Sequence, residues 1–158
     1  LDSPEQGLLT IVIWSDIKPQ NSGTFVACDS IPAVARHLLA HPEGLLPGQF
    51  GGLIDQCSDF IELTGEAGDV VILHPFLLHA ASKNPSGRAR FITNPPIALK
   101  EPMDFNRANQ ADFSPVEQGV LRGLGLERLD FCITGDRERI VPERVRRQQK
   151  MLEEQKNA

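Results

Sequence analysis

The sequence predicts a mainly β fold, an antiparallel barrel or jelly roll, with α-helices at its C-terminal end. Short runs of apolar and β-branched residues, separated by glycine- and proline-rich turns, fill residues 8–94. After about Leu99 the pattern changes to helical periodicity. Strands followed by helices favour a β core flanked by helices. Because the strands are too few for a complete eight-stranded jelly roll, we expect the core to be incomplete at its N-terminus, with further sequence before Leu1.

Size and composition limit the choice of fold and partners. The chain has 158 residues, of which 41% are hydrophobic and 23% charged, which suits one domain with a buried core. Its net charge of -5 argues against nucleic acid or an anionic membrane surface as a partner. No apolar run reaches the roughly 18–20 residues that span a bilayer. Three widely spaced cysteines form no C-x-x-C pair, so we expect a reducing, cytoplasmic location.

The first half of the chain predicts two strands and a helix. Residues 8–17 are rich in β-branched and apolar side chains and indicate a buried strand. A turn cluster at residues 18–23 leads into a short strand over residues 24–27. Ser30 is expected to cap a helix that has a proline in its first turn and stops at residues 41–44.

Three further strands are predicted before the change in pattern. Residues 59–64 alternate between polar and apolar side chains, which is typical of a half-exposed strand. Residues 65–69 form a tight connection to residues 70–73, which are apolar throughout and therefore predict a buried strand. Another strand is expected over residues 88–94, where two prolines end it.

Two helices are predicted after Leu99. Ser114-Pro115-Val116-Glu117 fits a capping box, so a helix should begin there and end at Gly125. The last helix should run from Pro142 to about Lys156, with a solvated face of oppositely charged pairs; a basic contact surface is the alternative.

The change in pattern also gives the domain organisation. Residues 1–99 are interpreted as the C-terminal portion of a β core, and residues 100–158 as a helical extension that packs on it.

The residues that indicate chemistry follow the apolar strand at residues 70–73. His79 comes shortly after this strand, and Arg90 lies eleven residues further on. A non-haem Fe(II) oxygenase site needs two imidazoles and one carboxylate, and 2-oxoglutarate needs a fixed bidentate cation for its far carboxylate. His79 and Arg90 are spaced to supply one iron ligand and that cation from the same barrel mouth.

The run Gly68-Asp69, His74-Pro75, His79, Asn84 and Arg90 resembles the C-terminal motif of phytanoyl-CoA dioxygenase-like Fe(II)/2-oxoglutarate oxygenases. The resemblance covers roughly residues 8 to 97. It implies a double-stranded β-helix core of the jelly-roll or cupin-like type. It also implies that His79 is the distal iron ligand and that Arg90 anchors 2-oxoglutarate.

The upstream part of the resemblance concerns Trp14 and the turn at residues 21–25, which are similar to the family's central strand and the turn after it. The resemblance implies that Trp14 lines the cosubstrate pocket, although a core role is the alternative. Two features depart from the family. Ser82 stands three positions after His79, where the family often has a hydroxyl residue at the second position. The family's His-x-Asp motif would lie before Leu1.

Other residues compete for these roles. Arg88 shares a strand face with Arg90, because side chains alternate with a period of two. His74 is interpreted as a hydrogen-bonded bystander at a strand end. His41-Pro42-Glu43 is the one H-x-E string, and we interpret it as a helix-terminating loop; a cupin-like metal site that uses His41 and Glu43 is the alternative.

We therefore expect a cytoplasmic Fe(II)- and 2-oxoglutarate-dependent dioxygenase that hydroxylates a small organic substrate, with neither nucleic acid nor a membrane as partner. One histidine cannot form a facial triad, so the 158 residues alone should bind iron weakly. The alternative is a catalytically inactive β-barrel binding module that lacks a complete metal site.

Overall fold

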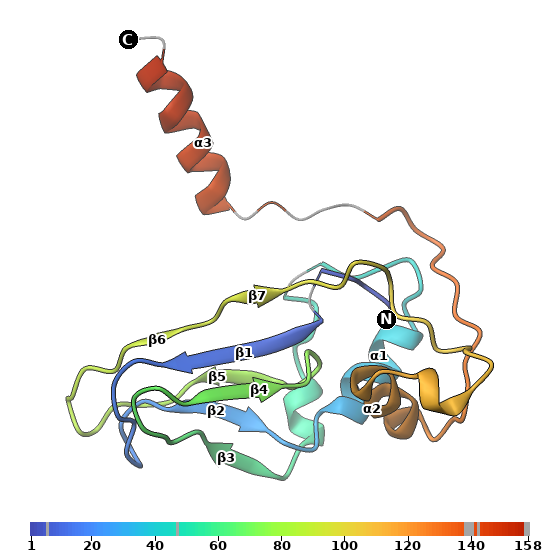
Figure 1. Ribbon diagram of the computed structural model, residues 1–158, viewed down its shortest axis with the longest axis horizontal. Helices are drawn as coiled ribbons and strands as arrows, with labels where there is room; N and C mark the ends of the chain where they lie inside the picture. The colour runs from blue at the N-terminus through green and yellow to red at the C-terminus, as the bar shows by residue number, and fades with distance from the viewer. Residues whose placement is uncertain (6, 47, 138–140, 142, 157–158) are drawn as a thin grey trace.

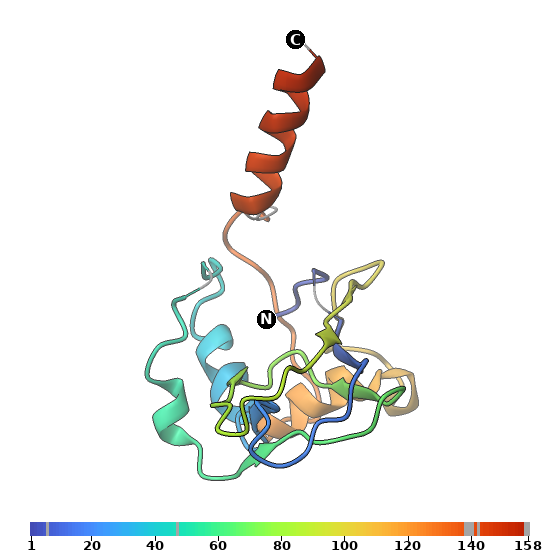
Figure 2. The same ribbon diagram turned by 90° about the vertical axis from the view of Figure 1, so that its left-hand side faces the viewer.

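The structure, a computed structural model, describes residues 1–5, 7–46, 48–137, 141 and 143–156. Two antiparallel sheets form one end of the body, and helices α1 (Ile31–Leu39) and α2 (Pro115–Leu124) form the other (Figure 1). A third helix, α3 (Glu143–Lys156), stands away from this body in both views (Figure 1 and Figure 2). Short 3₁₀ turns, η1 (Leu53–Gln56) and η2 (Gln110–Asp112), lie in the connections.

The first sheet is built around β1 (Leu8–Ile13). Its antiparallel neighbours are β4 (Val70–Leu73) along one edge, and β6 (Ile92–Thr93) and β7 (Pro96–Ile97) along the other. The sequence predicted a strand over residues 8–17, and the ladder covers its first part.

The second sheet has β2 (Thr24–Ala27) at its centre, between β3 (Phe60–Glu62) and β5 (His79–Ala81). The chain therefore moves between the sheets: from the first at β1 to the second at β2 and β3, back at β4, across at β5 and back at β6 (Figure 1). Each crossing brings residues far apart in the sequence into one layer.

The turn before β4 extends the β1–β4 ladder. Ile13 donates its N–H to the carbonyl of Asp69 at 3.0 Å, and Gly68 donates its N–H to the carbonyl of Ile13 at 2.8 Å. Gly68 has a φ of 104°, in the left-handed region that glycine adopts without strain. The Gly-Asp pair therefore marks a real turn that aligns β4 with β1.

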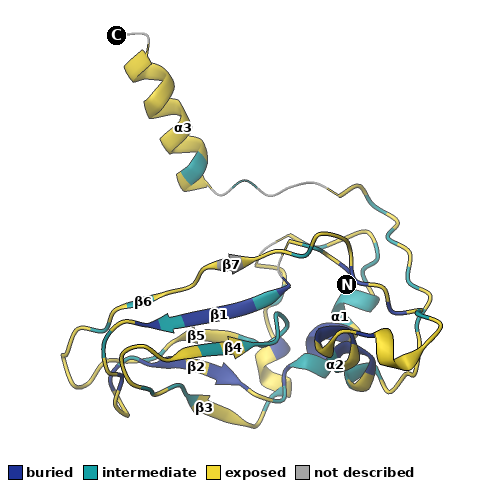
Figure 3. Ribbon diagram, viewed as in Figure 1, coloured by how far each residue is buried: buried dark blue, intermediate teal, exposed yellow. Residues whose placement is uncertain are grey.

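The two faces of the first sheet differ in burial. Ile11 and Ile13 alternate inward and form a buried cluster with Ile17. On the other face, Val70 and Ile72 are 56% and 63% exposed. Figure 3 shows the same contrast along the ribbon, with β1 largely buried and β3, β5 and α3 exposed. The inner face, which also contacts Leu63 just beyond β3, therefore contains the smaller of the two hydrophobic clusters.

The helical end contains the larger core. Helices α1 and α2 pack against each other, and buried side chains from the connection before α2 fill the space beside them. The buried members of this cluster are Ala35, Met103, Phe105, Phe113, Val116, Val120 and Leu121. The part of the chain between Leu99 and Phe131 therefore packs on the body, whereas α3 has no buried side chain among its described residues.

The predicted capping box of α2 is confirmed. The Ser114 hydroxyl accepts the N–H of Glu117 at 3.2 Å, and the Glu117 carboxylate accepts the N–H of Ser114 at 2.7 Å. The helix ends at Gly125, whose φ is 72°. Local chemistry thus sets both ends of α2 where the sequence placed them.

The prediction of a mainly β fold needs correction, because the fold is mixed: more of the described residues lie in helices than in strands. Several extended segments near β1 form one backbone contact each instead of a continuous ladder, and the strands are short for this reason. The N–H of Trp14 bonds the carbonyl of Phe91, and Ile17 forms an isolated bridge with Gly65. Among the described residues, no helix combines the length and apolar character needed to cross a bilayer.

Candidate functional site

His79 is the first residue of β5, and its hydrogen bonding indicates which ring nitrogen could bind a ligand. Its Nδ1 lies 2.9 Å from the carbonyl oxygen of Leu77. A carbonyl can only accept, so this contact assigns the proton to Nδ1 and leaves the lone pair of Nε2 available. Metal-binding histidines hold their other ring nitrogen in this way. The ring is exposed, and Nε2 is the atom through which it would bind a metal.

The position of His79 in the second sheet directs it toward the first sheet. His79 pairs with Val26, which pairs on its other side with Ile61, so the three side chains share one face. Leu63, two residues beyond Ile61, continues this face and packs on the inward cluster around Ile13. His79 therefore faces the space between the two sheets.

Arg90 approaches the same space from the first sheet. It precedes β6 by two residues, and Ile92 of β6 packs into the cluster between the sheets. Alternation therefore turns Arg90 inward, and it is half-buried while Arg88 is exposed. The Nη1 atom of Arg90 is buried and has no hydrogen-bond partner among the described residues.

A buried cationic donor without a partner is costly, because its desolvation is not repaid. A carboxylate would repay it with charge-assisted hydrogen bonds. Of the two candidate anchors in the sequence, Arg90 has this property and Arg88 does not. The geometry therefore favours Arg90 as an anion-binding group.

Trp14 lies elsewhere. It follows Ile13, so its side chain alternates to the outer face of the first sheet, where it is 61% exposed. Its indole Nε1 donates to the hydroxyl of Thr93 at 3.0 Å. The structure thus brings His79 and Arg90 to one side of the first sheet and Trp14 to the other.

The turn that leads to Arg90 is closed by side chains. Asn84 donates through Nδ2 to the carbonyl of Arg88 at 2.8 Å and accepts from the hydroxyl of Ser86 at 2.8 Å. The Ser86 hydroxyl also contacts Oδ1 of Asn21, which is buried. Asn84 therefore shapes the turn, and Asn21 attaches that turn to the loop before β2.

Glu62 is a residue of the second sheet that accepts several hydrogen bonds and that the sequence did not single out. Its carboxylate accepts the N–H groups of Gln20 and Gly23 at 2.7 and 2.9 Å and the hydroxyl of Ser82 at 3.1 Å. The Gln20 N–H is the largest of the causes that hold the pKa of Glu62 below its usual range. Ser82 therefore donates to Glu62. Glu62 pairs with Phe25, so its side chain lies on the face of the second sheet opposite to that of His79. The sequence offered no signal for this role, because the donors come from a turn about 40 residues earlier in the chain.

His74 is confirmed as a hydrogen-bonded residue at a strand end. Its Nε2 donates to the carbonyl of Val116 at 3.1 Å, and its Nδ1 accepts the N–H of Phe76 at 3.0 Å. Burial lowers its pKa, although the bond to Val116 acts in the opposite direction. With both ring nitrogens engaged, His74 ties the β4–β5 connection to α2 and leaves no lone pair for a metal.

His41 and Glu43 lie in the loop after α1, as the sequence indicated. Nδ1 of His41 is 2.9 Å from the Glu43 carboxylate, and its ring contacts that of His37 edge to face at 4.9 Å between centroids. In the described part of the chain, no group of three or more His, Cys, Asp or Glu side chains is placed to hold a metal ion.

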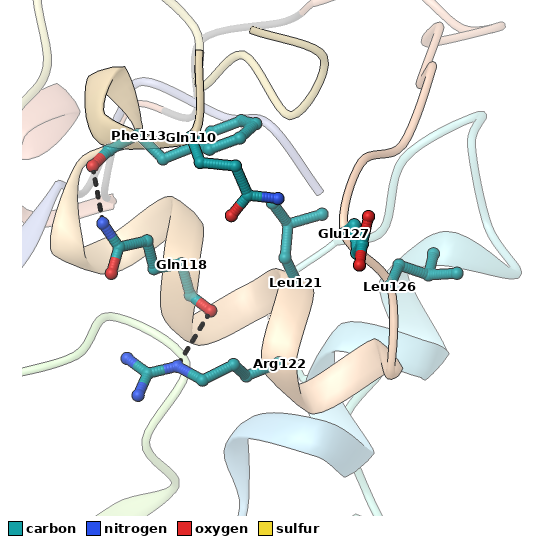
Figure 4. Close-up of a pocket in the computed structure, with 7 residues that line it drawn as sticks. All are labelled: Gln110, Phe113, Gln118, Leu121, Arg122, Leu126 and Glu127. Atoms are coloured by element: carbon teal, nitrogen blue, oxygen red, sulfur yellow. Dashed lines mark hydrogen bonds between the residues drawn. The ribbon is translucent and has the colours of Figure 1, made fainter. Parts of the chain in front are cut away.

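A surface hollow of about 390 Å³ lies beside α2 (Figure 4), and the residues that line it come from α2 and the segments next to it rather than from β5 or β6. The Gln118 amide donates to the carbonyl of Phe113 at 3.0 Å, and Arg122 donates to the carbonyl of Gln118 at 3.3 Å. These polar groups are already partnered within α2 and its cap, so the hollow is a weaker candidate than the space between the sheets.

Comparisons with protein-family models, with curated proteins and with solved structures give no significant match.

Proposed function

We propose that this chain forms the distal half of an Fe(II)- and 2-oxoglutarate-dependent oxygenase site. The observation that carries the proposal is the placement of an exposed imidazole nitrogen and a buried, unpartnered guanidinium nitrogen toward the same space. One is Nε2 of His79, left free by the bond from Nδ1 to Leu77, and the other is the buried Nη1 of Arg90. One group suits a metal and the other suits a carboxylate.

The sheet connectivity supports the fold that goes with this function. Strands that exchange repeatedly between two antiparallel sheets are what a jelly roll, or double-stranded β-helix, requires. The resemblance of residues 8 to 97 to phytanoyl-CoA dioxygenase-like oxygenases supports the same arrangement. In it, His79 and Arg90 would lie at one mouth of the barrel.

The residues at hand fit two of the groups that such a site needs. Arg90 would hold the far carboxylate of 2-oxoglutarate, and His79 would supply one imidazole. When bound, the iron and 2-oxoglutarate would supply the oxygen activation that hydroxylates a small organic substrate. The second imidazole and the carboxylate of a facial triad have no counterpart near His79 among the described residues, so we assign no reaction step to this chain.

A second candidate function follows from Arg90 alone. A buried guanidinium nitrogen can hold a small carboxylic acid without a metal, which would make the chain a catalytically inactive binding module. This candidate needs Arg90 and leaves His79 without a role. The two functions therefore differ in whether iron strengthens carboxylate binding.

Calorimetric titration with 2-oxoglutarate under anaerobic conditions, with and without Fe(II), tests both. The proteins are the wild-type chain, Arg90→Gln, His79→Ala and, as a matched control, Arg88→Gln. We expect Arg90→Gln to weaken binding about tenfold or more, because a charge-assisted bond is worth about 1.5–3 kcal/mol, while Arg88→Gln has little effect.

The effect of iron then separates the two functions. Iron that strengthens binding to wild type but not to His79→Ala supports the oxygenase site. Binding that depends on Arg90 and ignores both iron and His79 supports the binding module. If Arg90→Gln and Arg88→Gln bind alike, both functions are wrong.

A further inference from the structure

Ser30 stands at the corner between β2 and α1, where it is 0% exposed. It occupies the N-cap position of α1, but its side chain makes no capping bond. Its hydroxyl instead donates to the carbonyl of Ala27 at 2.7 Å and accepts the N–H of Leu78 at 2.9 Å. The expected cap is therefore absent, and Ser30 bonds a residue 48 positions along the chain.

The peptide unit that Ser30 holds is the one that bonds His79. The N–H of Leu78 and the carbonyl of Leu77 belong to one planar peptide group, so fixing one fixes the direction of the other. Ser30 holds the N–H at 2.9 Å, and the carbonyl accepts Nδ1–H of His79 at 2.9 Å. A line of contacts thus runs from the buried hydroxyl, through one rigid plane, to the imidazole.

Other contacts fix the β4–β5 connection on both sides of the Leu77–Leu78 peptide, but the orientation of that peptide depends on Ser30. The carbonyl of Leu78 accepts the N–H of Ala27 at 2.9 Å, which fixes the strand after the plane. Before it, His74 anchors the connection to α2. Among the described residues, the Ser30 hydroxyl is the group that bonds the N–H of the Leu77–Leu78 peptide.

We propose that Ser30 is a positioning residue for His79: it orients the Leu77–Leu78 peptide so that its carbonyl takes Nδ1–H and Nε2 remains free. The value of this for metal binding rests on the proposed function, whereas the effect on the ring does not. A serine that capped α1 would accept an N–H from the first turn of the helix. Ser30 instead accepts the N–H of Leu78, next to His79.

The test is nitrogen NMR of the His79 ring in metal-free protein, which reports which ring nitrogen carries the proton. The variants are Ser30→Ala, Ser30→Cys as a weaker hydrogen-bonding replacement of similar size, and Ser114→Ala as a control that removes a true helix cap. We expect Ser30→Ala to lower the ratio of the Nδ1–H to the Nε2–H form about two- to tenfold, the worth of one hydrogen bond. For Ser30→Cys the ratio should lie between those of wild type and Ser30→Ala, and for Ser114→Ala it should equal that of wild type.

A second measurement needs no variant, so it holds even if Ser30→Ala fails to fold. Hydrogen exchange of the Leu78 amide in wild type should be slow, because its N–H is bonded to a buried hydroxyl. Fast exchange of this amide, or an unchanged ring in folded Ser30→Ala, would overturn the proposal. If Ser30→Ala shifts the ring but 2-oxoglutarate binding ignores iron and His79 throughout, the positioning role stands and the oxygenase function fails.

Discussion

The helical end and the sheets differ in how fully their side chains find partners. At the helical end, Phe105 and Val120 are buried, and Glu117 is buried with its carboxylate bonded on both oxygens. In the sheets, Val70 and Ile72 are 56% and 63% exposed. The groups that remain available for a ligand, on His79 and Arg90, also lie on the sheet side.

This difference separates stability from binding. Satisfied, close-packed groups contribute most to the free energy of unfolding, whereas unsatisfied groups have free energy to gain from a ligand. Substitutions at the helical end should therefore destabilise the fold, and substitutions of inward polar groups in the sheets should change binding. Comparing variants at the helical end with matched variants in the sheets tests whether stability and binding are separated in this way.

The largest effect is expected from a truncation in the helical core. Phe105→Ala should lower the free energy of unfolding by about 3–5 kcal/mol, because it leaves a cavity among close-packed side chains. Ile72→Ala, on the exposed face of β4, should cost under about 1 kcal/mol. Urea titration of both variants measures the contrast, and similar losses would mean that the outer face of the first sheet is covered in solution.

The buried carboxylate at the start of α2 should give the next effect. Burial acts to raise the pKa of Glu117, but Arg107 and the N–H groups of Asp104 and Ser114 outweigh it and hold the pKa below its usual range. Glu117→Gln should cost about 1–3 kcal/mol near neutral pH. Because the folded pKa is lowered, this stabilisation is present above the ordinary carboxyl pKa of about 4.3 and is lost as pH falls below it.

Thermal unfolding at several pH values checks this, with Glu153→Gln on exposed α3 as the control. The gap between wild type and Glu117→Gln should narrow as the pH falls. A gap that is constant with pH would show that the carboxylate is not charged in the fold.

A smaller pH effect is expected from His74. Burial lowers its pKa, so the fold favours the neutral ring and binds fewer protons there than the unfolded chain. Stability from this residue is therefore present above the ordinary pKa of about 6.5 and is lost as pH falls through the lowered value. His74→Gln should reduce the fall in melting temperature between about pH 7.5 and 5.5, and His41→Gln should leave it unchanged. Equal falls in wild type and His74→Gln would contradict the burial of a neutral ring.

The smallest effect is expected at Trp14. Trp14→Phe removes the indole bond to Thr93 on an exposed face and should cost under about 1 kcal/mol. Affinity for 2-oxoglutarate should not change, because Trp14 lies on the outer face of the first sheet. If affinity falls several-fold, the pocket role indicated by the family resemblance is correct, and the outer face belongs to the site.

Elements set by local chemistry were predictable from the sequence. The capping box of α2, the Gly68-Asp69 turn and the strand after it all lie where the pattern placed them, but the prediction that this strand is buried was wrong, because Val70 and Ile72 of β4 are exposed. These signals are carried by neighbouring residues, so they do not depend on the rest of the fold.

Features that depend on distant partners were not predictable. The pattern at Ser30 indicated a helix cap, but its hydroxyl is taken by Leu78. The short strand β5 carries no alternation signal, because it is held by β2 rather than by its own composition. The role of Glu62 likewise depends on N–H groups from a turn about 40 residues earlier, which one strand cannot reveal.

The most direct test of the shared site is a titration of nitrogen-15-labelled chain with 2-oxoglutarate in the presence of Zn(II), a redox-inert substitute for iron. The signals to follow are the side-chain N–H groups of Arg90 and Arg88 and the ring nitrogens of His79. We expect Arg90 and His79 to respond with one common dissociation constant while Arg88 does not move. If both arginines respond alike, or Arg90 responds and His79 never does, the two groups do not form one iron and 2-oxoglutarate site.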